Sequence, residues 1–175
     1  MQNSSTTQWD ENGQLEVLTF DIGAERLAIE AVNIREILDL LPETRVPGAP
    51  AIVSSVVNFR GKIIPIADLR VIFGMTEPTA EMPGDHAEDM ALKYTSTDHR
   101  IVVIETELDS ETIQIGLRAD KVHEVATLEQ RDSSEPPLLG MRWRREFVRE
   151  LVRQPDSVIV LPDLQEIFRS MVSAA

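Results

Sequence analysis

The chain contains no cysteine among its 175 residues. This absence excludes a disulfide framework, a thiolate nucleophile and any zinc site built on cysteine. No apolar stretch is long enough to span a bilayer, and residues 1–12 are polar without a basic, apolar leader. The sequence therefore predicts neither direct membrane insertion nor a secretory signal, and the expected compartment is the cytoplasm.

Positive charge is also scarce, with 17 basic against 30 acidic side chains and a net charge of −13. Nucleic-acid binding is disfavoured because a basic face supplies most of that affinity, and anionic membrane surfaces are disfavoured for the same reason. The hydrophobic content of 42% is that of a soluble globular protein, large enough for one sizeable domain or two small ones sharing a core.

No constellation of catalytic residues is visible. The chain has neither a glycine-rich phosphate loop nor a G-x-S-x-G nucleophile elbow, and its three histidines lack metal-ligand spacing. One cluster could bind a cation, and it consists of Asp85, His86, Glu88 and Asp89. A solvated acidic loop is the better interpretation, because flexible ligands lose binding energy when they become ordered. The sequence predicts no enzyme, no cofactor and no metal.

The most informative segment is Val56–Leu69, which predicts two apolar strands around a tight turn. Gly61 can supply the positive φ that a short hairpin requires. Pro65 cannot donate from its amide, so the second strand is expected to be an edge strand or bulged. Asn58 and Arg60 near the tip indicate a docking surface, since arginine is enriched among binding anchors.

Short strands separated by glycine and proline turns fill most of the remaining chain. Residues 31–38 predict a helical turn passing into a strand, and the unbroken apolar run at 101–104 predicts a strand buried on both faces. Further strands are expected at 15–22, 27–29, 113–117, 121–125 and 158–161, and a helix at 164–171. No internal repeat is visible.

Residues 140–154 change period and predict an amphipathic helix, because Trp143, Phe147 and Leu151 lie four apart. On that helix four arginines would form one stripe. This stripe consists of Arg142, Arg145, Arg149 and Arg153. We favour the interpretation that it is a solvated face with i,i+4 ion pairs over the alternative that it binds an anion.

Five segments resemble one family. N-F-R-G-K-I-I-P-I-A-D-L-R is similar to the signature N-L-R-G-x-I-x-P-[IV]-x-D-L-R of the CheW-type chemotaxis coupling proteins. Four more follow that family's order between Glu16 and Phe168: L-E-V-L-T-F-D-I-G-A-E-R-L-A-I-E, V-N-I-R-E-I-L, I-G-L-R-A-D-K-V-H-E-V and V-I-V-L-P-D-L-Q-E-I-F.

The resemblance implies a mostly β fold of two small five-stranded SH3-like barrels around a shared hydrophobic core, with short helices including one near the C-terminus. The expected division is a first barrel at 15–74, with part of its sheet completed by the C-terminal segment, and an acidic linker or inserted loop at 75–98. A second barrel with the helix 140–154 is expected at 99–161, and a C-terminal helix at 162–175.

The function that the resemblance implies is that of a non-catalytic adaptor. It would join the cytoplasmic tips of methyl-accepting chemoreceptors to a CheA-type histidine kinase, in receptor arrays at the inner face of the membrane. The expected partner-binding residues are Ile34, Glu36, Val57, Asn58, Phe59, Arg60 and Gly61. The alternatives are the regulatory module of a related two-component kinase and, from another class, a small hydrolase with no identifiable catalytic residues.

The resemblance also implies that Glu36 pairs with Arg60 beside the docking surface. Without the resemblance, the favoured interpretation of these two residues is an ordinary surface ion pair worth about 0–1 kcal/mol. It implies a receptor groove between the barrels, lined by apolar residues such as Ile34, Val56, Val57, Phe59, Val122 and Val125. Two features depart from the family: Ser55 stands where glycine is usual, and the acidic segment between the halves is longer.

Overall fold

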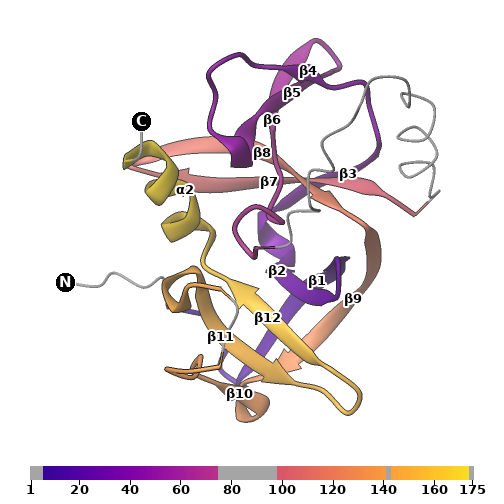
Figure 1. Cartoon of the computed structure of the whole chain (residues 1–175). Helices are drawn as coiled ribbons and strands as arrows, with labels where there is room; N and C mark the ends of the chain where they lie inside the picture. The colour runs from indigo at the N-terminus through magenta and orange to yellow at the C-terminus, as the bar shows by residue number, and fades with distance from the viewer. Residues whose placement is uncertain (1–5, 75–97, 141–142, 174–175) are drawn as a thin grey trace.

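The computed structural model describes residues 6–74, 98–140 and 143–173. These residues form two curled six-stranded sheets and the helix α2 (Leu164–Ser173). Figure 1 shows one sheet above the other, with α2 beside the place where they meet. The expected mostly β fold with a C-terminal helix is confirmed. No helix within these ranges is both long and apolar enough to cross a membrane.

One sheet, here called the terminal sheet, takes its strands from both ends of the chain. Their spatial order is β10 (Ser133–Ser134), β11 (Val148–Arg153), β12 (Val158–Pro162), β2 (Glu25–Glu30), β1 (Gln14–Ile22) and β9 (Lys121–Glu129). In Figure 1 its indigo and orange-to-yellow strands lie side by side, although they are far apart in sequence.

The other sheet, here called the central sheet, is built from the middle of the chain. Its order is β3 (Ile34–Asp39), β7 (Arg100–Leu108), β8 (Glu111–Ala119), β6 (Lys62–Ala67), β5 (Ser55–Phe59) and β4 (Thr44–Arg45). Short 3-10 helices connect strands in both sheets: η1 (Ala31–Asn33), η2 (Ala51–Val53), η3 (Gln130–Asp132) and η4 (Arg145–Phe147).

In each sheet the two edge strands follow one another along the chain. β9 continues through η3 into β10, and β3 continues through residues 40–43 into β4. Each sheet can therefore curl until its edges are joined covalently, which removes the exposed edges of an open sheet. Counted with β9–β10 and β3–β4 as single bent strands, each sheet has the expected five.

The two sheets have the same topology, and the structure reveals a repeat. β1 to β6 correspond in order to β7 to β12, since every pairing in one sheet has its counterpart in the other, including the parallel pairs β12–β2 and β6–β8. The halves have exchanged their first hairpins: β1–β2 joins the sheet of β9–β12, and β7–β8 joins the sheet of β3–β6. The expectation of no internal repeat is therefore wrong.

Sequence traces of this repeat survive at its most constrained positions. D-L-R-V-I-F follows β6 at 68–73, and D-L-Q-E-I-F follows β12 at 163–168. The leucine and phenylalanine of the first copy and the isoleucine and phenylalanine of the second are at most 2% exposed, and all four pack in one cluster. The motif recurs because both copies supply the same part of the shared core.

Three apolar clusters hold the fold together. Each sheet encloses a small one, which includes Val17, Val152 and Leu161 in the terminal sheet and Val57, Ile64 and Ile101 in the central sheet. The largest draws on both sheets, η4 and α2, with fully buried members such as Phe20, Leu117 and Phe168. This is the expected shared core, and it explains how two small barrels are stabilised together.

Because the hairpins are exchanged, neither of the expected subdomains 15–74 and 99–161 corresponds to one sheet. Each range contributes strands to both sheets. Residues 14–30 lie in the terminal sheet, and residues 100–119 lie in the central sheet. The C-terminal strands pair with the opening hairpin, as anticipated for the first barrel. Most of the expected acidic segment 75–98 lies outside the described residues.

The expected helix 140–154 is wrong. The described part of this segment contains only the short η4 and the strand β11, which pairs with β10 and β12. Apolar residues four apart lie on the same face of a helix, but residues separated by an even number also lie on the same face of a strand. Val148 and Val152 are both buried in β11, so their spacing did not distinguish the two structures.

Pro65 also departs from expectation. β6 lies between β5 and β8, so it is not an edge strand. Its register with β8 begins only at Ile66, opposite Gly116, whereas its register with β5 runs over Lys62–Ile66. Pro65 therefore lies where β6 pairs on one side only, and its missing N–H interrupts no ladder with β8.

Candidate functional site

The β5–β6 hairpin ends in a two-residue turn at Arg60 and Gly61. Their φ angles of 51° and 78° are both positive, as in a type I′ turn, which matches the twist of the flanking strands. The backbone N–H of Gly61 donates to Asn58 Oδ1 at 3.1 Å. The expected glycine turn is confirmed, and it raises the Arg60 side chain at the tip of the hairpin.

Arg60 contacts two of the expected site residues. Its Nη1 lies 3.4 Å from Glu36 Oε1 across the sheet, and its guanidinium carbon lies 4.7 Å from the centre of the Phe59 ring. Its side chain nevertheless remains 77% exposed. The expected contact between Glu36 and Arg60 is therefore present, and the exposed guanidinium also lies over an aromatic ring.

The remaining expected site residues lie at different depths. Val57 is 1% exposed inside the central sheet, so its side chain supports the hairpin from beneath. Phe59 is half-buried against the same cluster, and Ile34 is half-buried against the shared core. Of the second-half residues expected in the groove, Val122 packs against the shared core, whereas Val125 is 56% exposed.

Ser55, at the position where the family usually has glycine, is 7% exposed and donates a hydrogen bond to Glu43 Oε2 at 2.6 Å. In the terminal sheet the two residue types occupy each other's positions: Ser133 of β10 donates to Glu150 Oε1 of β11 at 2.8 Å. Each barrel thus fastens its two-residue edge strand with one serine–glutamate bond, so here the serine has a defined partner.

An open groove of about 530 Å³ lies beside the same hairpin, where β6 and β8 diverge beyond their short parallel register. Its walls include Ile63, which is 59% exposed, and Ile113 of β8. Lys62 Nζ donates to Gln114 Oε1 at 2.6 Å across one end. Exposed apolar side chains beside polar groups are typical of interaction surfaces.

We call Arg35, Glu105 and Gln114 the central triad, of which Glu105 and Gln114 line this groove. Glu105 of β7 accepts from Arg35 Nη2 at 2.6 Å and from Gln114 Nε2 at 3.1 Å. These two hydrogen bonds, the one from Arg35 above all, lower the pKa of Glu105 from its ordinary 4.5 to about 2. The carboxylate therefore stays charged at any physiological pH.

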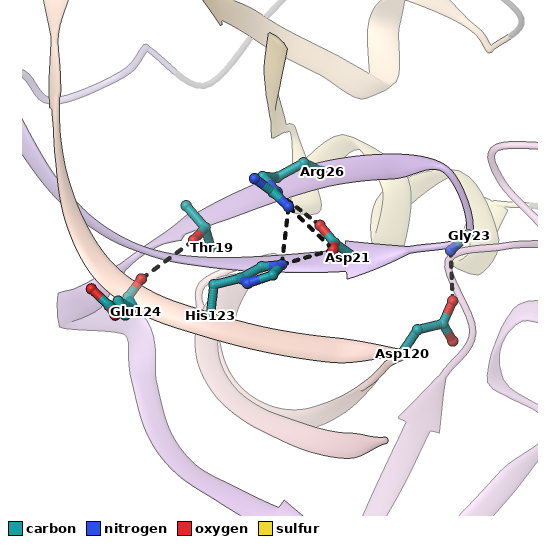
Figure 2. A network of polar contacts seen from close by, with 7 residues as sticks. All are labelled: Thr19, Asp21, Gly23, Arg26, Asp120, His123 and Glu124. Carbon is teal, nitrogen blue, oxygen red and sulfur yellow. Dashed lines mark hydrogen bonds and ion pairs between the residues drawn. The ribbon is translucent and has the colours of Figure 1, made fainter. Parts of the chain in front are cut away.

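At the equivalent place in the other sheet, Asp21, Arg26 and His123 form what we call the terminal triad, and Figure 2 shows it from close by. Asp21 of β1 accepts from Arg26 Nε at 2.9 Å and lies 2.7 Å from His123 Nε2. Burial raises the pKa of Asp21, but the hydrogen bonds from Arg26 and His123 outweigh it and hold the pKa below its ordinary value.

Asp120 lies beside the terminal triad, where the chain crosses from β8 to β9 and so from one sheet to the other (Figure 2). Its backbone N–H donates to the Asp21 carbonyl at 2.9 Å, and its Oδ2 accepts from the Gly23 N–H at 2.6 Å. Its other oxygen pairs with Arg70 and lies 3.7 Å from His99 Nδ1. One carboxylate thus links turns of both sheets.

The sequence did not identify either triad, because each is assembled from three strands. A signal was present in the repeat: I-R-E-I at 34–37 and V-H-E-V at 122–125 occupy the same positions in the two sheets. Comparing these motifs aligns Arg35 with His123 and so identifies one member of each triad.

The expected arginine stripe is wrong because its helix does not form. Arg149 lies in β11, where Nη1 is 2.5 Å from Glu30 Oε1 and the two side chains are only 10% and 13% exposed. Arg145 instead reaches the Pro136 carbonyl at 3.0 Å and Glu135 at 3.7 Å. Arg149 and Arg145 therefore have structural partners within the chain, and Arg142 lies outside the described residues.

A search for groups of three or more histidine, aspartate or glutamate side chains that could hold a metal ion finds none in the described ranges. The acidic cluster at 85–89 lies outside those ranges. The candidate site thus combines an exposed cation, an aromatic ring and a partly apolar groove on one sheet.

Comparison with known proteins identifies the family of this chain. A family model described as the CheW-like domain matches residues 16–172. The chemotaxis protein CheW of Rhizobium meliloti is 29% identical over 161 residues, which cover 91% of this chain and 90% of that protein. CheW of Treponema pallidum is 26% identical over 157 residues, covering 90% and 84%.

The crystal structure of scaffolding protein TtCheW from Thermoanaerobacter tengcongensis superposes with a TM-score of 0.68 at 24% identity, covering 88% of this chain and 92% of that one. It shares the fold of two SH3-like barrels, as expected from the sequence. Since the family model spans nearly the whole described structure, this chain belongs to the CheW-like domain family.

Proposed function

We propose that this protein is a non-catalytic scaffold of a chemotaxis complex, which couples the cytoplasmic tip of a methyl-accepting receptor to a CheA-type histidine kinase. The relatives named above are chemotaxis proteins, and the solved neighbour is a scaffold. The observation that carries the proposal is the Arg60 turn, where an exposed guanidinium lies between Glu36 and the Phe59 ring.

This turn suits a reversible interface. Glu36 holds Arg60 in place without burying it, so a partner carboxylate can approach with the guanidinium already oriented. The adjacent groove offers the apolar area that such a contact needs. Two partners that each bury part of this sheet could influence one another through contacts that differ between signalling states. The complex would assemble in receptor arrays at the inner face of the membrane.

Charge reversal at the turn tests the proposal. Arg60→Glu is expected to weaken binding of a purified receptor tip or kinase regulatory domain at least tenfold, because a like-charge contact at an interface costs several kcal/mol. Arg131→Glu is the matched control, since Arg131 is 78% exposed in η3, which connects two strands of the terminal sheet. Unchanged binding of both partners by a folded Arg60→Glu protein would refute the role of this turn.

A charge exchange separates the role of the pair from that of Arg60 alone. Glu36→Arg combined with Arg60→Glu restores an ion pair across the strands but reverses its orientation. If the pair only stabilises the hairpin, the double variant should bind like the wild type. If Arg60 itself meets the partner, the double variant should remain defective while its melting temperature recovers.

A further inference from the structure

The two triads are equivalent, residue by residue. Asp21 pairs in register with Arg26 as Glu105 pairs with Gln114. The third member comes in each case from the bulged edge strand. In the central sheet Ile34 is in register with Ile104, and Arg35 is the next residue. In the terminal sheet Val122 is in register with Phe20, and His123 is the next residue. Each triad therefore places a carboxylate between one group from its own hairpin and one from the neighbouring edge strand.

The triads differ in whether they can change charge. Arginine and glutamine do not titrate near neutral pH, so the groups bound to Glu105 keep one charge state. In the terminal triad the permanent guanidinium has moved to the hairpin, as Arg26, and the edge strand supplies a histidine instead. Imidazole exchanges its proton between about pH 5 and 8, so this triad alone can gain a charge in that range.

The geometry at His123 makes its protonation state matter. Nε2 lies 2.7 Å from Asp21 Oδ2, which can only accept, and 3.2 Å from Arg26 Nη2, which can only donate. A neutral imidazole satisfies one of these neighbours: a protonated Nε2 donates to Asp21, and a bare Nε2 accepts from Arg26. The imidazolium carries hydrogens on both nitrogens and so always donates to Asp21.

The charged groups around His123 come from three strands. Asp21 of β1 and Arg26 of β2 face the ring, and on β9 itself Lys121 is in register with Asp21 while Glu124 is exposed. The imidazole is 26% exposed, so protons can reach it from solvent. The Asp21 carbonyl in turn accepts from Asp120, which connects the triad to the crossover between the sheets.

We propose that His123 is a proton-responsive switch at this crossover, and that its counterpart Arg35 keeps the central sheet insensitive to pH. When His123 is protonated, the bond to Asp21 is fixed and the start of β9 gains one positive charge. When it is neutral, Asp21 and Arg26 compete for Nε2, and the contact exchanges between two arrangements. The terminal sheet, including the exposed Val125 on β9, would thus respond to pH while the Arg60 turn would not.

The test exchanges the two side chains and follows the carboxylates by NMR between pH 8 and 5. In the wild type, the Asp21 carboxyl carbon is expected to shift with the same midpoint as the His123 ring, while Glu105 stays constant. His123→Arg should make Asp21 constant as well. Arg35→His should make Glu105 follow a new imidazole midpoint, transferring the response from one sheet to the other.

His99→Gln is the control, because His99 is the other described histidine near this crossover, and it should leave the Asp21 response unchanged. His123→Gln replaces the arginine variant if the larger side chain prevents folding. An Asp21 signal that stays constant while His123 titrates would overturn the proposal. So would an Asp21 response that survives in His123→Gln but disappears in His99→Gln.

Discussion

The terminal and central sheets share one topology but present different surfaces. Both curl around small clusters of aliphatic side chains at equivalent register positions, such as Val152 opposite Ile159 and Val57 opposite Ile64. Their connecting turns differ. The β5–β6 turn presents Arg60 and Gly61 with positive φ, whereas Pro155, whose ring fixes a negative φ, stands in the β11–β12 turn.

This difference lies at surface positions, whereas the apolar positions that specify the fold are shared by both sheets. The buried pattern is retained in both copies, while charged groups have been exchanged, as in the two triads, or replaced, as at the two turns. The central sheet carries the exposed Arg60 guanidinium beside a groove. The two sheets are thus nearly equivalent in topology and differ in the side chains that they expose.

Separating the two halves is the strongest test of the hairpin exchange. Fragments 1–85 and 86–175 would each contain strands of both sheets but a complete set for neither. We expect each fragment alone to lack native circular dichroism, and a mixture of the two to recover it. Cooperative thermal unfolding of either fragment by itself would show that a half folds independently and that the exchange is not needed for stability.

Gly116 distinguishes the sheets at a buried position. A Cβ there would lie 2.6 Å from Ile66 Cδ1 and 2.7 Å from Ile101 Cγ2, so Gly116→Val should destabilise the protein by about 1–3 kcal/mol in urea unfolding. The equivalent residue of the terminal sheet is Ala28, which faces Thr19 as Gly116 faces Val103.

Ala28→Gly is the matched control and should cost only about 0.5–1 kcal/mol. A smaller loss for Gly116→Val than for Ala28→Gly would mean that the central sheet is not packed as closely as these distances indicate.

The sequence predicted most of the fold because the local signals were strong. The hairpin at 56–69, the buried strand at 101–104 and the closing helix all formed as expected, since apolar runs and glycine turns act within a few residues. The pairing of Glu36 with Arg60 was also anticipated, through the family resemblance.

What the sequence could not provide were relations between distant strands. The exchange of hairpins depends on which strands pair, and the same local sequences are compatible with two consecutive barrels. At 140–154 the spacing of Val148 and Val152 fitted a helix and a strand equally, and the pairing of β11 with β12 decided the outcome. Both triads required the bulges, which shift the register by one residue and have no sequence signature of their own.

A smaller effect is expected at the turn that makes the central sheet distinct. A Cβ on Gly61 would meet nothing within 4 Å, so Gly61→Val tests backbone strain alone at φ 78°. We expect a loss of about 1–2 kcal/mol, measured by thermal unfolding. Gly61→Asn should lose less, because asparagine tolerates left-handed backbone. Equal melting temperatures for the valine and asparagine variants would contradict a strained turn.

The smallest effect concerns the central triad in acid. Because the pKa of Glu105 falls from 4.5 to about 2 on folding, its ionised form favours the native state. That contribution is complete above about pH 4.5 and is lost as the pH falls towards 2, so the difference in unfolding free energy between wild type and Glu105→Gln should shrink over this window.

Urea unfolding at pH 7, 4 and 2.5 measures this difference, and high salt should reduce it because the Arg35 side chain is 47% exposed. Asp21→Asn supplies the comparison between the sheets. Removing that carboxylate also leaves Arg26 and His123 facing each other, so its cost should be larger when His123 is protonated than when it is neutral. A Glu105→Gln difference that grows on acidification, rather than shrinking, would show that the carboxylate is not the ionised partner of Arg35.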